Sequence, residues 1–258
     1  MSAISAIHGI VARDLQRAAR QKSRMLGGLA RPFIWLLLIG GGYGAIARVD
    51  GGSYHAFVFP GVVAMAVLFG GMLTAISTVY DREFGMLRLM LASPAGVGVI
   101  LAGRTLSAAL VGGLQGLAVL ACAPFLLDAT AGHYLAALGA LSLSAVSSGA
   151  LGLLVASRLR SVENFAGVIN VVLFPLFFLS GALYPLAGVP SALRTVARVN
   201  PVTYQVDLMR HALGQGPEFG LTFDLLALLG SSILALALAG ALFDPERRFL
   251  ASVGGARR

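Results

Sequence analysis

Six apolar stretches, each long enough to cross a lipid bilayer, dominate this sequence. A helix needs about 20 predominantly apolar residues to span the hydrocarbon core. Backbone polar groups are costly in lipid unless they are paired, so each stretch is expected to be helical. The predicted spans are residues 27–47, 57–79, 99–127, 135–156, 165–183 and 221–243. Because the chain is 57% hydrophobic and only 12% charged, the predicted fold is an all-α integral membrane protein with six transmembrane helices.

The positions of the basic residues predict how the spans are oriented. If both termini are cytoplasmic, 15 of the 19 Lys and Arg residues fall on the inside. Cytoplasmic loops carry this excess in membrane proteins, so we expect both termini inside. The same distribution accounts for the net charge of +8 without nucleic-acid binding. Eighteen arginines beside the single Lys22 are typical of a GC-rich bacterium, which makes the bacterial inner membrane the expected location.

A short charged segment, YDREFGMLRLMLASP (residues 80–94), separates the second and third spans. Helical spacing places Phe84, Leu87 and Leu91 on one stripe, with Glu83 and Arg88 off it. A hydrophobic chain has little use for such charges unless the segment leaves the bilayer to meet something. We therefore predict a cytoplasmic helix over residues 81–92 that receives force from a soluble partner.

The N-terminal residues 1–24 form a second amphipathic pattern. Apolar residues from Ile4 to Ala18 follow helical spacing, while Arg13, Arg17 and Arg20 lie on the opposite face. A helix of this kind lies in the plane of the membrane interface. Its arginines are expected to face lipid headgroups alone or, as the alternative, a cytoplasmic partner as well.

Residues 184–218 are too polar to span the membrane and too apolar for a solvated loop. Asn200 followed by Pro201 is typical of a helix N-cap and first helical position. On the helix that follows, Asp207 is placed to meet Arg210 or His211. We predict an extracytoplasmic re-entrant hairpin before the last span, with a surface-lying helix pair as the alternative. Its notable residues are Asn200, Pro201, Tyr204 and Asp207.

The fifth predicted span carries an aromatic stripe. Phe174, Phe177 and Phe178 are spaced i, i+3, i+4, and Asn170 is the one amide in the middle of the span. Such a stripe either packs in the core or faces lipid, or it lines a substrate path. We keep all four residues as candidates for the path.

The sequence lacks nucleotide-binding, catalytic and metal-binding motifs. A phosphate-binding loop needs a Gly-Lys pair, but Gln21 precedes the only lysine. No catalytic residues and no metal ligands with the usual spacing are found. The chain is therefore predicted not to be an enzyme and to carry no cofactor of its own. If transport is driven by ATP, a partner chain binds ATP and Mg²⁺.

Three stretches resemble one known family, the permease subunits of type-2 ATP-binding-cassette exporters. They are YDREFGMLRLMLASP, FPLFFLSGALYPL (residues 174–186) and NPVTYQVDLMR (residues 200–210). The resemblance runs over nearly the whole chain, and it implies a single permease domain over residues 1–258. It also implies a homodimer, or a pseudo-symmetric heterodimer, above a cytoplasmic ATPase dimer. It places a coupling helix at the ATPase interface, with the contact residues Asp81, Glu83, Phe84, Gly85, Met86, Leu87 and Arg88.

The mechanism that follows is ATP-driven export of a lipophilic, lipid-linked or glycan substrate. We expect Phe84 and Leu87 to be the anchors buried in the ATPase, with Glu83 and Arg88 forming charge pairs at the rim. Membrane lipids are expected partners and nucleic acid is not. Two rival functions remain open: an ATP-independent membrane scaffold that docks a soluble enzyme, and a secondary carrier, which the near absence of ionisable groups inside the spans disfavours.

Overall fold

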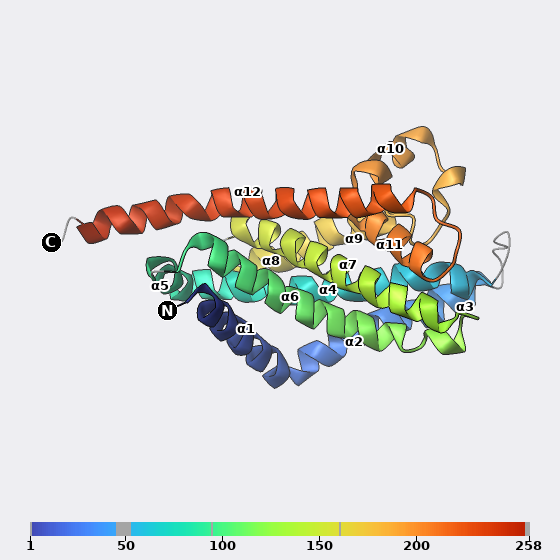
Figure 1. Ribbon diagram of the computed structural model, residues 1–258, viewed down its shortest axis with the longest axis horizontal. Coiled ribbons are helices and arrows are strands. Elements are labelled where there is room, and N and C mark those ends of the chain that lie inside the picture. The colour runs from blue at the N-terminus through green and yellow to red at the C-terminus, as the bar shows by residue number, and fades with distance from the viewer. Residues whose placement is uncertain (1, 45–52, 94, 160, 256–258) are drawn as a thin grey trace.

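A computed structural model describes residues 2–44, 53–93, 95–159 and 161–255 of the chain. Side chains are described throughout these ranges except at residues 43, 44, 166, 169, 170 and 244–255. Every regular element in these ranges is helical, which confirms the predicted class. The long helices run side by side along one axis, and the start of α1, α5 and the end of α12 lie at the same end of the bundle (Figure 1).

Within the described residues, four helices are long and apolar enough to cross a membrane, and they coincide with the second, third, fourth and sixth predicted spans. Among them α4 is central, because most of its residues are buried, whereas α12 lies at the periphery. The third span continues from α6 into a short 3-10 turn, Ala123–Phe125. The four are α4 (Tyr54–Glu83), α6 (Val97–Leu120), α7 (Ala131–Arg158) and α12 (Leu221–Gly255).

The first predicted span is helical up to Gly44, and the fifth is helical only up to Phe178, five residues short of its predicted end. Each is interrupted by a five-residue π-helical segment. In the fifth, Pro175 is the second residue after this segment and has no N–H to offer the carbonyl of Val171. A widened turn is a common response to such a break. Neither stretch is one long α-helix, so a total of six spans stays a prediction. The first stretch comprises α2 (Lys22–Trp35), η1 (Leu36–Gly40) and α3 (Gly41–Gly44), and residues 45–47 lie outside the described residues. The fifth stretch comprises α8 (Val162–Val168), η3 (Ile169–Leu173) and α9 (Phe174–Phe178).

The two amphipathic segments form helices with bounds that differ from those predicted. The N-terminal helix is α1 (Ala3–Arg20), and Gln21 separates it from α2. The predicted helix over 81–92 is shorter, because α4 continues to Glu83 and α5 begins only at Met86 and ends at Ala92. Gly85 separates them with a φ of 78°, a left-handed conformation that glycine adopts without strain.

Two short helices precede α12, as the prolines predicted. Asn200 caps α11 (Pro201–Ala212) by accepting a hydrogen bond from the N–H of Val202 at 3.0 Å. In α11 all but two residues are buried, and the helix packs against α4, α7 and α12. The preceding helix, α10 (Ser191–Val199), lies at the corner of the molecule and is mostly exposed (Figure 1). Whether the pair re-enters the membrane stays a prediction.

Glycines hold α4 and α6 close together. A Cβ added to Gly112 would lie 2.7 Å from the carbonyl oxygen of Val67 and 3.0 Å from the nitrogen of Gly71. Both are backbone atoms of α4 and cannot move aside. Small residues allow such close approach between membrane helices, and this contact sets the spacing of the central helix pair.

We predict that Gly112→Ala lowers stability by about 1–3 kcal/mol, because the added methyl group overpacks this contact. The midpoint of thermal unfolding of the purified protein in one detergent measures the effect. Gly139→Ala is the matched control, since a Cβ at Gly139 in α7 meets nothing within 4 Å. If both variants unfold at the wild-type temperature, α4 and α6 do not make the close contact described at Gly112.

Candidate functional site

The turn between α4 and α5 projects from the end of the bundle. The left-handed Gly85 reverses the chain there, and Phe84 is left 77% exposed. Further along, Leu89 is 69% exposed and Arg88 is also exposed. An exposed apolar ring and an exposed apolar side chain beside a charge are typical of a protein contact surface. We call residues 83–90 the exposed turn.

The inner side of α5 anchors the exposed turn to the bundle. Leu87 is only 1% exposed and Leu91 is also buried. They belong to a core cluster with Ile100 and Leu101 of α6 and Phe243 of α12. The prediction that Leu87 inserts into a partner is therefore wrong, since this side chain is already enclosed by its own chain. Periodicity placed Phe84 and Leu87 on one stripe, but the turn at Gly85 separates them.

Polar contacts tie the end of α4 to α7 and α8. Arg82 donates hydrogen bonds to the carbonyls of Ala156, Ser157 and Leu159 at 2.7–3.0 Å, at the C-terminal end of α7. The carboxylate of Glu83 accepts a hydrogen bond from the N–H of Val162 at 3.1 Å, at the first residue of α8. The Glu83 carboxylate therefore serves as a cap of α8, where a rim contact to a partner was expected.

Behind the exposed turn, a buried charge cluster joins three helices. Asp81 of α4 forms ion pairs with Arg104 of α6, with Arg13 of α1 at 2.7 Å and with Arg17 at 3.2 Å. Asp14 of α1 pairs with Arg104 at 3.1 Å and with Arg13 at 3.2 Å. Asp81, Asp14 and Arg104 are each at most 3% exposed. We call these five residues the charge cluster.

The charge cluster was not predicted. We expected Asp81 at the ATPase interface and the α1 arginines toward lipid or a partner, but Asp81, Arg13 and Arg17 bind one another inside this chain. Of the predicted interface arginines, only Arg20 is exposed without an ion pair among the described residues. A signal was present in the sequence: Arg104 lies within an apolar stretch, and a charge at that position needs a buried acidic partner.

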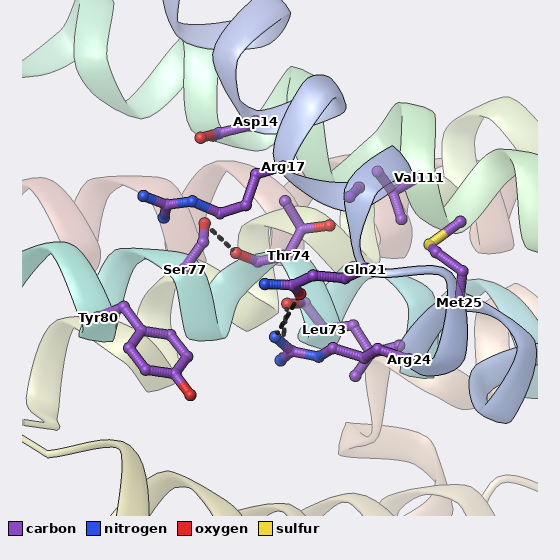
Figure 2. A pocket seen from close by; sticks show the side chains of 11 residues that line it. Asp14, Arg17, Gln21, Arg24, Met25, Leu73, Thr74, Ser77, Tyr80 and Val111 are labelled. Atoms are coloured by element: carbon purple, nitrogen blue, oxygen red, sulfur yellow. Dashed lines mark hydrogen bonds between the residues drawn. The ribbon is translucent and has the colours of Figure 1, made fainter.

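Next to the charge cluster, a small cleft opens where α1 meets α2. Figure 2 shows Arg17 and Arg24 extending across it beside Tyr80 and Ser77 of α4. Arg24 donates to the carbonyl of Leu73 at 3.3 Å. The volume of about 30 Å³ has room for about one water molecule and none for an organic substrate.

A larger groove lies beside the exposed turn. It has a volume of about 630 Å³ and runs between the first half of α1 and the connection from α5 to α6. Its walls are mainly small or apolar residues, among them Ala6, Gly9 and Met90, and Arg13 lies at its edge. This size is typical of sites that receive a ligand or a partner's side chains.

The predicted aromatic stripe is divided by the fold. Phe177 is fully buried, so it faces no open path in this structure. Phe174 and Phe178 lie nearer the surface with ring centroids 6.1 Å apart, and Phe178 contacts Trp35 of α2 at 5.5 Å. Asn170 lies outside the residues whose side chains are described. A role of the stripe in a substrate path stays a prediction.

The predicted residues around α11 lie in the contacts that fold this region. Asn200 also donates to the carbonyl of Leu176 at 2.6 Å, which joins α11 to α9. Tyr204 donates to the carbonyl of Arg198 and packs against Phe219 at 5.6 Å. Asp207 lies 4.0 Å from Arg210, as expected, but its main contacts are the N–H groups of Glu218 and Phe219 at 2.7 and 2.8 Å.

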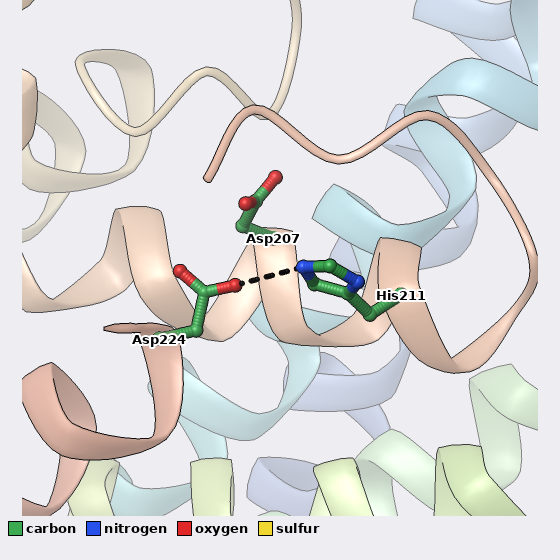
Figure 3. A group of neighbouring side chains, drawn as sticks. All are labelled: Asp207, His211 and Asp224. Atoms are coloured by element: carbon green, nitrogen blue, oxygen red, sulfur yellow. Dashed lines mark ion pairs between the residues drawn. The ribbon is translucent and has the colours of Figure 1, made fainter. Parts of the chain in front are cut away.

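Asp207, His211 and Asp224 come together between α11 and α12, which the sequence did not predict (Figure 3). The Nε2 atom of His211 lies 3.3 Å from the carboxylate of Asp224 and 2.9 Å from the carbonyl oxygen of Phe219. Asp224 is fully buried. Two carboxylates and an imidazole are possible metal ligands, but those of Asp207 and His211 already have partners in this chain. The expectation of no metal site stays untested.

The fold and the site together define a class of protein. Several apolar helices of bilayer length make the chain a multi-pass membrane protein, and the exposed turn is joined to α6, α8 and α12. The family profile of ABC-2 type transporters matches residues 5–213, from α1 to the end of α11. The chain belongs to this family and is a membrane permease subunit for transport.

Curated relatives are similar over most of their length. Nodulation protein J of Rhizobium leguminosarum bv. viciae is 33% identical over 198 residues, which cover 74% of this chain and 75% of that protein. Nodulation protein J of Rhizobium meliloti (strain 1021) is 28% identical over 221 residues, or 84% of each chain. The putative transport permease ycf38 of Porphyra purpurea is 26% identical over 216 residues, which cover 81% of this chain and 74% of that protein.

Proposed function

We propose that this chain is the permease subunit of an ATP-driven exporter that moves a lipophilic, lipid-linked or glycan substrate outward. A separate ATPase dimer binds ATP and Mg²⁺ and docks on the exposed turn. The observation that carries the proposal is the turn itself, because Phe84 and Leu89 are exposed while Leu87, two residues before Leu89, is buried in the core. Such a turn can take up force without unfolding.

The contacts behind the exposed turn support a mechanism for coupling. Glu83 and Arg82 connect the end of α4 to α8 and α7. Asp81, the residue directly before Arg82, connects α4 to α1 and α6 through the charge cluster. When the ATPase dimer closes on nucleotide, it pushes these helices as one body and opens a path along the dimer axis. A bias of a few kcal/mol between two states is enough for alternating access.

The complete assembly is proposed as a homodimer of six-span subunits in the bacterial inner membrane, with both termini in the cytoplasm. Supporting the dimer, an apolar surface on η1 and on η3 is left open by the single chain: Leu37, Leu38 and Val171 are all largely exposed. The start of α1, the exposed turn and the end of α12 share one end of the bundle (Figure 1). This arrangement is what a common cytoplasmic side requires.

Co-purification of the chain with its soluble partners tests the function. We expect a stoichiometric complex whose ATP hydrolysis in proteoliposomes depends on the permease. If no partner with a phosphate-binding loop binds, and another soluble enzyme occupies the exposed turn, the chain is a scaffold. Transport driven by an ion gradient without any ATPase would make it a secondary carrier. Either result contradicts the proposal.

A further inference from the structure

Arg31 is a half-buried charged residue that lies beside aromatic rings at the edge of the bundle. It belongs to α2, and its guanidinium lies over the ring of Phe69 at 4.3 Å and near that of Phe174 at 5.9 Å. Phe69 stands midway along α4, the most buried of the apolar helices. At that level of a membrane helix a charge is costly, and such charges usually serve a function.

Arg31 has no acidic partner. Among the residues that the structure describes, no side-chain hydrogen bond or ion pair reaches its guanidinium, whereas Arg104, also in an apolar helix, has two carboxylates. The side chain is only half-buried, so part of it remains accessible. Contact with an aromatic ring offsets only part of the cost of such a charge.

The surface around Arg31 is apolar and aromatic. Trp35 lies one helical turn further along α2. Its ring centroid is 5.5 Å from that of Phe178 and 6.1 Å from that of Phe177. Phe174 bridges Arg31 and Phe178. The exposed side chains of Ile34 in α2 and Leu38 in η1 continue the apolar surface. Arg31 therefore lies at the border of an aromatic face that is formed by α2, α4 and α9, three helices far apart in the sequence.

We propose that this face binds an anionic amphiphile, with a phosphate-type or carboxylate group on Arg31 and the apolar chain against Trp35, Phe174 and Phe178. The site narrows the substrate of the proposed exporter to the anionic members of the lipophilic and lipid-linked class, and in that respect it rests on the proposed function. The guanidinium presents several donors in a fixed plane, which suits an oxyanion.

The single tryptophan of the chain, Trp35, makes binding measurable. The full-length permease is placed without ATPase in nanodiscs of zwitterionic lipid. Its fluorescence is then titrated with terminally brominated dodecyl phosphate, with the brominated dodecyl glucoside and with inorganic phosphate. We expect half-maximal quenching by the alkyl phosphate at about tenfold lower concentration than by the glucoside, as one charged hydrogen-bonding group provides. Inorganic phosphate should leave the emission unchanged.

Variants separate the site from general attraction of anions to a basic protein. Arg31→Gln should remove the tenfold preference, and Arg31→Lys should retain part of it. Arg20→Gln, at an exposed position of α1, is the matched control and should behave like the wild type. Equal quenching by both amphiphiles in the wild type, or a preference that survives in Arg31→Gln, would overturn the proposal. A response to inorganic phosphate as strong as to the alkyl phosphate would also overturn it, because the apolar surface would then contribute nothing.

The outcome is independent of the ATPase. If the ATPase binds but the preference is absent, the exporter function stands and the anion site fails. If the preference is present but no ATPase binds, the site stands and the exporter function fails.

Discussion

Replacing Asp81 with asparagine should lower the free energy of unfolding by about 3–5 kcal/mol, the usual cost of removing one partner from a buried ion pair. The substitution keeps the shape of the side chain but removes the carboxylate that Arg13, Arg17 and Arg104 share. Arg104 is 2% exposed and would keep only Asp14. We also expect α1 to separate from α4, because most of its ionic contact with that helix passes through Asp81.

Unfolding in mixed micelles measures the loss, and hydrogen exchange of the α1 amides measures the separation. Asp128→Asn is the matched control, since Asp128 lies in an exposed loop and forms no ion pair with any described residue. The double variant Asp81→Asn, Arg104→Met should recover part of the stability, because it no longer leaves a buried cation short of partners. A wild-type stability and wild-type exchange in Asp81→Asn would show that the charge cluster does not hold these helices together.

The second large effect is expected at the exposed turn, where neighbouring apolar residues should behave in opposite ways. Phe84→Ala and Leu89→Ala should each weaken ATPase binding by about tenfold or more, as loss of an interface anchor does, and leave the unfolding temperature unchanged. Leu87→Ala should instead cost about 2–5 kcal/mol of stability, because Leu87 fills the core between α5, α6 and α12. Binding of the purified ATPase to the immobilised permease and thermal unfolding separate the two effects.

A control far from the exposed turn is available in Leu135→Ala, a largely exposed leucine near the start of α7. It should change neither ATPase binding nor stability. If Phe84→Ala and Leu89→Ala bind the ATPase as tightly as the control does, the partner docks elsewhere on the chain.

Features that depend on neighbouring residues were predicted well from the sequence. The apolar length of α4, α6, α7 and the first part of α12 is a local property, and all four were located. The Asn200–Pro201 pair predicted the start of α11, because the amide cap and the fixed φ of proline act within one turn. The π-helical breaks in the first and fifth stretches were not predicted, since average hydrophobicity carries no information about how a helix widens around proline and glycine.

Features that depend on distant residues were predicted poorly. The charge cluster joins residues up to 90 positions apart, and helical periodicity within α1 or the turn cannot indicate that Arg13 and Arg17 meet Asp81. The burial of Leu87 could not be predicted either, because it depends on Phe243 of α12, which is distant in the sequence. Gly85 was counted as one more helical residue, although its left-handed backbone separates two helices and turns Phe84 away from Leu87.

The most direct test of the account is the side of the membrane on which the exposed turn lies. Leu89→Cys in a Cys122→Ser background leaves a single thiol, at an exposed position of the turn. We expect an impermeant maleimide to label it in inside-out vesicles but not in right-side-out vesicles, and we expect bound ATPase to block the labelling. Labelling from the outer face, or labelling that bound ATPase leaves unchanged, would contradict the claim that this turn receives the force for transport.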